Sequence, residues 1–574
     1  MHVNEQPPSH PDQPSASLPA TAPELGSGIG GFSPAARRWL ASAAWAVGGL
    51  ALFGLILRIS LSSPVNSDGA NISMQGWDLL HGHLLLSGWI VADASYYAFE
   101  VPLLAISEFL FGLTTTASHV ASALTYVIVL GFAVALARSG SRGPAAVARA
   151  GVVTAVLAAP VLSQQGASTL LEAPQHIGTS VFLLASFLLV DRFPGRRFTP
   201  VLLALILIAG QLADATVLFV AVPAVVLVCA SRVLSARSVR TSDAAAGVAA
   251  IASVPLEYLL RVAMVHLGGY WLIHPKTALA PVGQWPGHVV LAWRNVCTLF
   301  GSVGAVVLNQ GGAPSGLIAL FGLACLLAAA LGLAKVAWTW RTASRAEQLA
   351  ATAIVVNLVV FTVSTIPTPF SAREIAVVLP CGAVLAARAC VPARIADPAW
   401  AGTVAGAAAL VAVLPLATAA VTLPKEPVWP TSAPLAAWLK AHRLTYGIGG
   451  YWDAGAATLE SGGQVQVRAV VSITSRAGQP GVPASGWWGP GKISAFYWET
   501  RLDWYDPSLH DARFVIVNGQ APGSVPLTPA EVQHAFGPPT ATYQVAGHEI
   551  MVYRMNLLRR LGPPLLPAPI STGP

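Results

Sequence analysis

Long apolar runs separated by short polar segments dominate the first three quarters of the chain. A helix that crosses the hydrocarbon core of a bilayer needs about 20 predominantly apolar residues. The pattern predicts a mainly α, polytopic membrane protein of about eleven transmembrane helices. The predicted spans are 38–60, 117–138, 145–162, 176–191, 198–212, 214–231, 245–267, 313–337, 349–366, 374–391 and 399–423.

Basic residues recur in every second loop between these spans. Examples are Arg142, Arg197, Arg341 and Arg388. Because Lys and Arg are enriched in loops that face the cytoplasm, they predict a cytoplasmic N-terminus. Loops 61–116 and 268–312 and the C-terminal part of the chain would then lie outside the cytoplasm.

Residues 96–113, "YYAFEVPLLAISEFLFGL", are apolar but carry Glu100 and Glu108. This composition favours a helix that lies along the outer membrane interface over a further span. A span here would invert every later segment and place the Arg-rich loops outside.

The last quarter of the chain has a different pattern. The segments "QVQVRAVVSI", "ARFVIVNG" and "HEIMVYRM" predict strands, whereas "TSAPLAAWLKAHRL" and "TPAEVQHAF" predict helices. Thr528 and Glu531 have the spacing of a capping box at the start of the second helix. We therefore expect residues 36–423 to form the transmembrane domain and 424–560 a small extracytoplasmic α/β domain. Pro- and Ser-rich residues 1–35 and the tail 561–574 are expected to be disordered.

Composition supports a membrane protein. The 574 residues are 54% hydrophobic and only 10% charged, with a mean hydropathy of +0.62, whereas soluble domains have about 25% charged residues. The net charge of +7 is explained by basic loops that orient spans, so no nucleic-acid partner is expected. The partner expected for this surface is the lipid bilayer of the cell membrane.

Ionisable residues at the outer ends of spans are the candidates for chemistry, because placing charge at membrane depth costs free energy. Asp68 follows the first span in "NSDG", where an Asp-Gly turn is the structural alternative. Glu172 and His176 lie in the second outer loop, "SQQGASTLLEAPQHIG". They would hold a divalent cation, Mg²⁺ or Mn²⁺, or would simply be a solvated acid and a helix-start residue.

Four further ionisable residues lie within or at the ends of predicted spans. Asp214 falls in the tight turn between two spans. Glu257 and Arg261 are four residues apart on one helix face, where they would pair with each other or line a polar cavity. Arg373, followed by Glu374, lies at the outer start of a span. A guanidinium there would bind a phosphate at headgroup level or extend to lipid phosphates.

This arrangement resembles the GT-C superfamily of polyprenyl-phosphate-sugar-dependent glycosyltransferases, which includes protein mannosyltransferases and aminoarabinose transferases. The resemblance covers roughly residues 38–423 and rests on Asp68, Glu172, and Arg373 with Pro380. The superfamily's paired first-loop acids are absent, and Glu374 stands where an aromatic residue is common. The Ala- and Arg-rich composition suggests an actinobacterial branch.

The resemblance implies transfer of a hexosyl or pentosyl group, with inversion, from a polyprenyl-phosphate-linked sugar donor. The acceptor would be an extracytoplasmic glycan or protein selected by the C-terminal domain. Asp68 would be the general base, and Arg373 would bind the departing phosphate. A transporter or lipid-sugar flippase and a non-catalytic membrane scaffold are the alternatives.

The remaining candidates have supporting roles in this interpretation. Arg261, Glu257 and Asp214 would contribute to substrate binding. Glu172 and His176 would orient the site or hold the cation.

Overall fold

A computed structural model describes residues 34–235, 241–273, 278–302, 313–369, 371–394, 398–422, 431–472, 493–517 and 527–562. Nearly all of the predicted N-terminal disorder and of the predicted disordered tail lies outside these ranges. The chain divides into two compact units between Leu50 and Ala51, within α1 (Pro34–Ser60). The second unit contains every residue discussed below.

Each predicted span coincides with a helix. Six helices of the described residues are long and apolar enough to cross a membrane, and α1, α8 and α15 contain shorter apolar segments. The predicted mainly α membrane fold is confirmed. The helices at the predicted spans are α1, α4 (Thr115–Ala137), α5 (Gly143–Val161), α7 (Thr179–Arg192), α8 (Thr199–Ala213), α9 (Val222–Ser235) with the π-helical turn η1 (Val217–Ala221), α10 (Thr241–His266), α13 (Ala313–Trp338), α14 (Arg345–Val363), α15 (Val378–Cys390) and α16 (Pro398–Thr422).

Small residues allow the helices of this bundle to approach closely. A Cβ atom added to Gly332 of α13 would lie 2.7 Å from the backbone of Leu385 in α15. In a bilayer the hydrophobic effect does not favour helix–helix contact over helix–lipid contact. Membrane helices therefore associate through close van der Waals packing of this kind.

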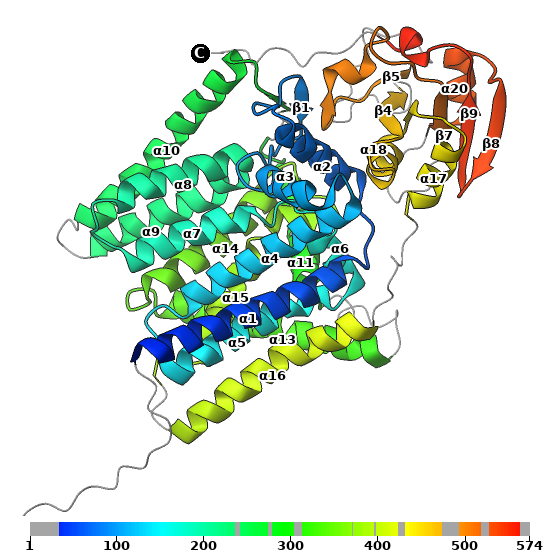
Figure 1. The fold of residues 1–574 in the computed structure, drawn as a ribbon. Coiled ribbons are helices and arrows are strands. Elements are labelled where there is room, and N and C mark those ends of the chain that lie inside the picture. The colour runs from blue at the N-terminus through cyan, green and yellow to red at the C-terminus, as the bar shows by residue number, and fades with distance from the viewer. Residues whose placement is uncertain are drawn as a thin grey trace, which may run out of the picture. The chain divides into compact units, whose positions relative to one another are not determined.

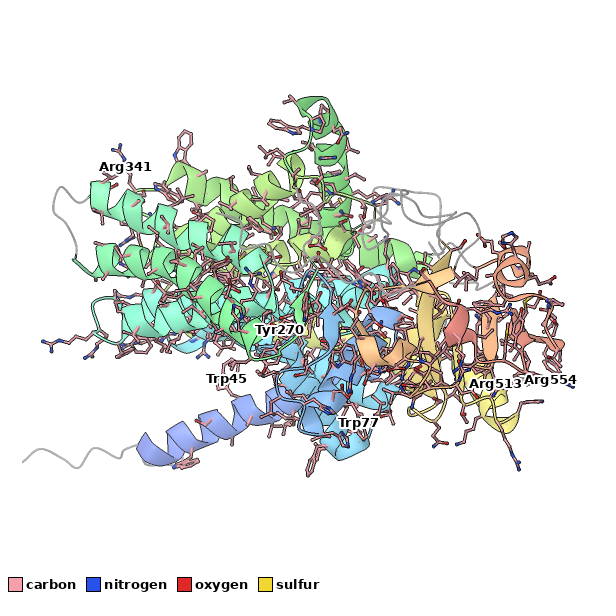
Figure 2. All side chains as sticks on the ribbon, turned by 90° about the horizontal axis from the view of Figure 1, so that it is seen from above. Trp45, Trp77, Tyr270, Arg341, Arg513 and Arg554 are labelled. Atoms are coloured by element: carbon pink, nitrogen blue, oxygen red, sulfur yellow. The ribbon has the colours of Figure 1, made fainter. Side chains whose placement is uncertain are left out.

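Arginines satisfy carbonyl groups at one end of the bundle. Arg345 donates to the carbonyl oxygen of Val190 (2.9 Å), and Arg388 donates to that of Ser139 (2.9 Å). Both side chains are buried. The sequence pattern assigned Arg388 to a loop that orients the spans. The structure shows that both arginines also donate to carbonyl oxygens at helix ends, Val190 of α7 and Ala137 of α4, which lack partners within their own helix. Arg341 lies at this end of the bundle, away from Trp77 and the C-terminal domain (Figure 2).

The opposite end carries short elements between the long helices. They are α2 (Ser67–Leu80), α3 (Glu100–Phe111), α6 (Gln164–Leu171), α11 (Trp285–Leu299) and the 3₁₀ turn η3 (Ser371–Ile375). At 12 residues, α3 is too short to cross a bilayer, as predicted. It exposes Ile106, Phe109 and Leu110 and buries Glu100 and Glu108. This apolar surface suits a helix that lies in the membrane interface.

The C-terminal residues fold into a sheet of order β5-β4-β3-β7-β9-β8. Its strands are β3 (Tyr446–Gly449), β4 (Gln466–Ser472), β5 (Ile493–Ala495), β7 (Phe514–Val517), β8 (Ala541–Val545) and β9 (His548–Val552). Strand residues alternate between two cores: one packs on α17 (Ala433–Ala441) and α18 (Tyr451–Glu460), the other on α20 (Pro529–Phe536) (Figure 1). The predicted capping box of Thr528 and Glu531 is present.

A second, three-stranded sheet joins this domain to the loops 61–116 and 268–312. Strand β1 (Trp89–Val91) pairs in parallel with β2 (Trp271–Leu272) and antiparallel with β6 (Thr500–Arg501). Arg501 also donates to Asp78 of α2 (2.8 Å). The C-terminal domain is thereby fixed by backbone hydrogen bonds to the same end of the bundle that carries α2 and η3.

Candidate functional site

Asp68 lies in the first turn of α2. Asn66 is the N-cap, and its side chain accepts a hydrogen bond from the Gly69 amide (2.9 Å). The Asp-Gly turn considered as the alternative is therefore wrong, because the cap starts a helix there. A carboxylate in the first helical turn is favoured by the helix dipole. A Cβ on Gly69 would lie 2.5 Å from that of Ala173, so glycine lets α2 pack on the loop that carries Glu172.

Arg373 of η3 contacts two other segments of the chain, residues 169–175 and the start of α2. Its Nη2 donates to Glu172 Oε2 (3.1 Å), its Nη1 to Gln175 Oε1 (2.7 Å) and its Nε to the Thr169 carbonyl (3.2 Å). Nη1 also lies 4.0 Å from Asp68 Oδ2. Asp68, Glu172 and Arg373, which the sequence pattern selected independently, thus converge at one end of the bundle. The three side chains remain 15–21% exposed, so a ligand can reach them.

Burial controls the protonation of the two acids beside Arg373. Burial raises the pKa of Asp68, although hydrogen bonding to Tyr451 and the charge of Arg373 act in the opposite direction. Burial likewise raises the pKa of Glu172 to about 7, against the charge of Arg373. A carboxylate with a raised proton affinity is suited to remove a proton from a hydroxyl group.

His176 forms the centre of a second group of polar residues. Its Nδ1 lies 3.0 Å from Asp214 Oδ2, and its Nε2 lies 2.8 Å from the Tyr96 hydroxyl and 3.7 Å from Glu374 Oε1. Burial alone would lower the pKa of His176, but Glu374 and Asp214 outweigh it and raise that pKa to about 10. The imidazolium that results, together with the Thr179 hydroxyl, lowers the pKa of Asp214 to about 2 against the effect of burial. His176 has a φ of 55°, which these contacts hold in place.

Glu172 and His176, as arranged, do not fit a site for a divalent cation. Glu172 is bound to Arg373, and a protonated imidazole has no lone pair for a metal. Across the part of the chain that the structure describes, no three His, Cys, Asp or Glu side chains are grouped as metal ligands. The expected Mg²⁺ or Mn²⁺ stays a prediction, but Glu172 and His176 in this arrangement would not be its ligands.

The C-terminal domain contributes two side chains that the sequence pattern did not reveal. The Tyr451 hydroxyl donates to Asp68 Oδ1 (2.5 Å) and lies 3.0 Å from Glu499 Oε2. The Ala456 amide donates to the Ser67 hydroxyl (3.3 Å), so α18 packs directly on the start of α2. Nothing local to either residue signals this contact, because Tyr451 is 383 positions from Asp68.

Glu257 and Arg261 form the ion pair that their spacing permits, with 3.5 Å between Oε1 and Nε. Glu257 is buried in α10. Within the described ranges, no hydrogen bond or ion pair joins either residue to Asp68, Arg373 or His176. Their predicted part in substrate binding stays a prediction.

The chain matches no protein-family model and no curated protein sequence. Its structure is similar to that of ArnT from Cupriavidus metallidurans bound to undecaprenyl phosphate, with a TM-score of 0.54, 14% identity, and coverage of 91% of this chain and 99% of ArnT. The same ArnT in the apo state gives a TM-score of 0.52, 13% identity, and coverage of 91% and 100%. The similarity extends over the membrane bundle and the C-terminal domain, so the chain has the fold of ArnT.

Proposed function

We propose that this protein is a membrane glycosyltransferase that moves a sugar from a polyprenyl-phosphate donor to an acceptor outside the cytoplasm. The observation that carries the proposal is the convergence of Asp68, Glu172 and Arg373 at one end of the bundle. The shared fold supports the choice of donor, since the similar ArnT structure holds undecaprenyl phosphate.

The geometry supports a single nucleophilic displacement, in which the acceptor oxygen replaces the phosphate at the anomeric carbon of the sugar. Asp68 would take the proton of an acceptor hydroxyl as that oxygen attacks the anomeric carbon. The bond from this carbon to the phosphate oxygen would break, and the polyprenyl phosphate would leave with the electron pair. Arg373 would stabilise the charge that develops on the phosphate, while Glu172 and Gln175 hold the guanidinium in place. His176, the other cation of the site, would remain bound to Asp214 and Glu374.

A ligand-binding experiment tests the donor class. Undecaprenyl phosphate should raise the thermal unfolding temperature of the purified protein, because a ligand that binds only the folded state stabilises it. Undecaprenol has the same chain without the phosphate and serves as the matched ligand. Equal shifts with both compounds would show that the site does not recognise the phosphate.

We further propose that the N-terminus is cytoplasmic and that the C-terminal domain with the site lies outside. Replacement of the exposed Cys390 by Ser gives a background without accessible thiols, because the other four cysteines are buried. In intact cells, an impermeant thiol reagent should then label Leu509→Cys, an exposed position of the C-terminal domain, and should spare Arg341→Cys. The reverse pattern would show that the membrane orientation is inverted.

A further inference from the structure

Tyr451 connects two carboxyl groups from different parts of the chain, the partly exposed Asp68 and the buried Glu499. Its hydroxyl lies 2.5 Å from Asp68 Oδ1, in the first turn of α2, and 3.0 Å from Glu499 Oε2, next to β6. Glu499 is only 3% exposed and Tyr451 only 7%. Glu499 has a φ of 48°, a conformation that the adjoining pairing of β6 with β1 maintains. This backbone strain indicates that the position of the carboxyl group is imposed by the fold.

Two hydrogen bonds among Asp68, Tyr451 and Glu499 require a second proton besides that of the Tyr451 hydroxyl. A tyrosine hydroxyl has one proton and donates it to one acceptor only. If Tyr451 donates this proton to Asp68, the phenol oxygen can only accept a hydrogen bond from Glu499. Glu499 can donate that hydrogen bond only when its carboxyl group is protonated. Two ionised carboxylates on either side of one buried hydroxyl would repel each other.

The surroundings decide which carboxyl group holds that proton. Asp68 faces Arg373, His176 and Gln175, all of which favour its ionised form. Burial and the charges of Asp68 and Asp93 raise the pKa of Glu499 and outweigh its hydrogen bonds with Tyr451 and Asn71, which act in the opposite direction. No cation pairs with Glu499 in the described part of the chain. The proton therefore belongs on Glu499, and the hydrogen bonds run from Glu499 to Tyr451 to the Asp68 carboxylate.

We propose that Glu499 is a protonated positioning residue, which acts through Tyr451 to orient the Asp68 carboxylate and to keep it ionised for proton removal. The C-terminal domain is then part of the catalytic site. The inference rests on the proposed transferase function. The Glu499 proton stays in place through the reaction. Asp68 takes the acceptor proton on its other oxygen, Oδ2, and returns it to solvent once the product has left.

Substitutions of Glu499 and Tyr451 test this arrangement by the pH dependence of transfer. Glu499→Gln should retain activity within about threefold, because its amide N–H donates to the Tyr451 oxygen as the protonated acid does. Glu499→Ala and Tyr451→Phe should lower kcat by about tenfold or more. Tyr451→Phe removes a hydrogen bond to the ionised form of Asp68 and so raises its pKa. The acid limb of kcat/KM should therefore move to higher pH by about one unit.

Matched controls come from the same domain. Tyr543→Phe and Glu549→Gln, both on the outer hairpin of β8 and β9, should leave rate and pH profile unchanged. Every variant is first tested for thermal stabilisation by undecaprenyl phosphate, so that a variant that fails to fold is excluded from the comparison.

A Glu499→Gln variant as impaired as Glu499→Ala would overturn the inference. So would a Tyr451→Phe variant whose acid limb of kcat/KM does not move. If Asp68→Asn is also fully active, the assignment of Asp68 as the base fails with it. A wild-type protein that transfers no sugar would instead refute the transferase proposal. If only Asp68→Asn is impaired, this inference alone fails.

Discussion

An Asp68→Asn variant should fold and insert into the membrane normally but lose at least about a hundredfold of its transfer activity. Asparagine has the shape of aspartate and still accepts a hydrogen bond from Tyr451 through its amide oxygen. The helix start is preserved as well, because its cap is Asn66 and not Asp68. The amide takes up no proton at physiological pH, so only the function of a base is removed. Transfer of a labelled sugar from a polyprenyl-phosphate donor, corrected for expression level, measures the effect.

Asp511→Asn is the matched control for this substitution. Asp511 is an exposed acid of the C-terminal domain that pairs with Arg513. The same exchange there should leave transfer unchanged. Normal transfer by Asp68→Asn would reduce Asp68 to a residue of the helix start and would remove the catalytic assignment.

Arg373→Lys should lower kcat by on the order of a hundredfold, the usual cost of removing a group that stabilises developing negative charge. The guanidinium makes hydrogen bonds to Thr169, Gln175 and Glu172 at the same time and still faces Asp68. An ammonium group keeps the charge but not the planar set of donors. The loss should therefore appear even though the net charge of the site is unchanged.

Arg513→Lys provides the comparison, because Arg513 is a surface arginine of the C-terminal domain with an acidic partner of its own (Figure 2). It should have full activity. If Arg373→Lys were equally active, a planar, multiply bonded guanidinium would not be what this position supplies, and the phosphate role would be lost.

The helical part of the fold could be predicted because its signal is local. Each apolar run from the first span to 399–423 is long and poor in charge, and membrane insertion depends on little else. Asp68, Glu172 and Arg373 could also be identified locally. Placing a charged group at the end of a span costs free energy, so such residues are candidates for a functional site. Which segments these residues would meet did not follow from the pattern, because contacts over some 200 positions depend on how the helices pack.

The parts that were missed depend on tertiary contacts. Strands β1, β2 and β6 have two or three residues each, too few for any periodicity to be recognised. They nevertheless place Glu499 and the C-terminal domain on α2. In "NSDG" the local preference for a turn was overridden by Asn66, which caps a helix that packs on the following loops.

Cleavage of the bond between sugar and phosphate is the most direct test of the proposed function. The purified protein is placed in vesicles with a polyprenyl-phosphate donor labelled separately in its sugar and its lipid, together with envelope material as acceptor. We expect the labels to separate, with the sugar in the acceptor fraction and free polyprenyl phosphate in the membrane, for the wild-type protein but not for Asp68→Asn. A donor that crosses the bilayer with both labels still joined would instead identify a lipid-sugar transporter and contradict the account.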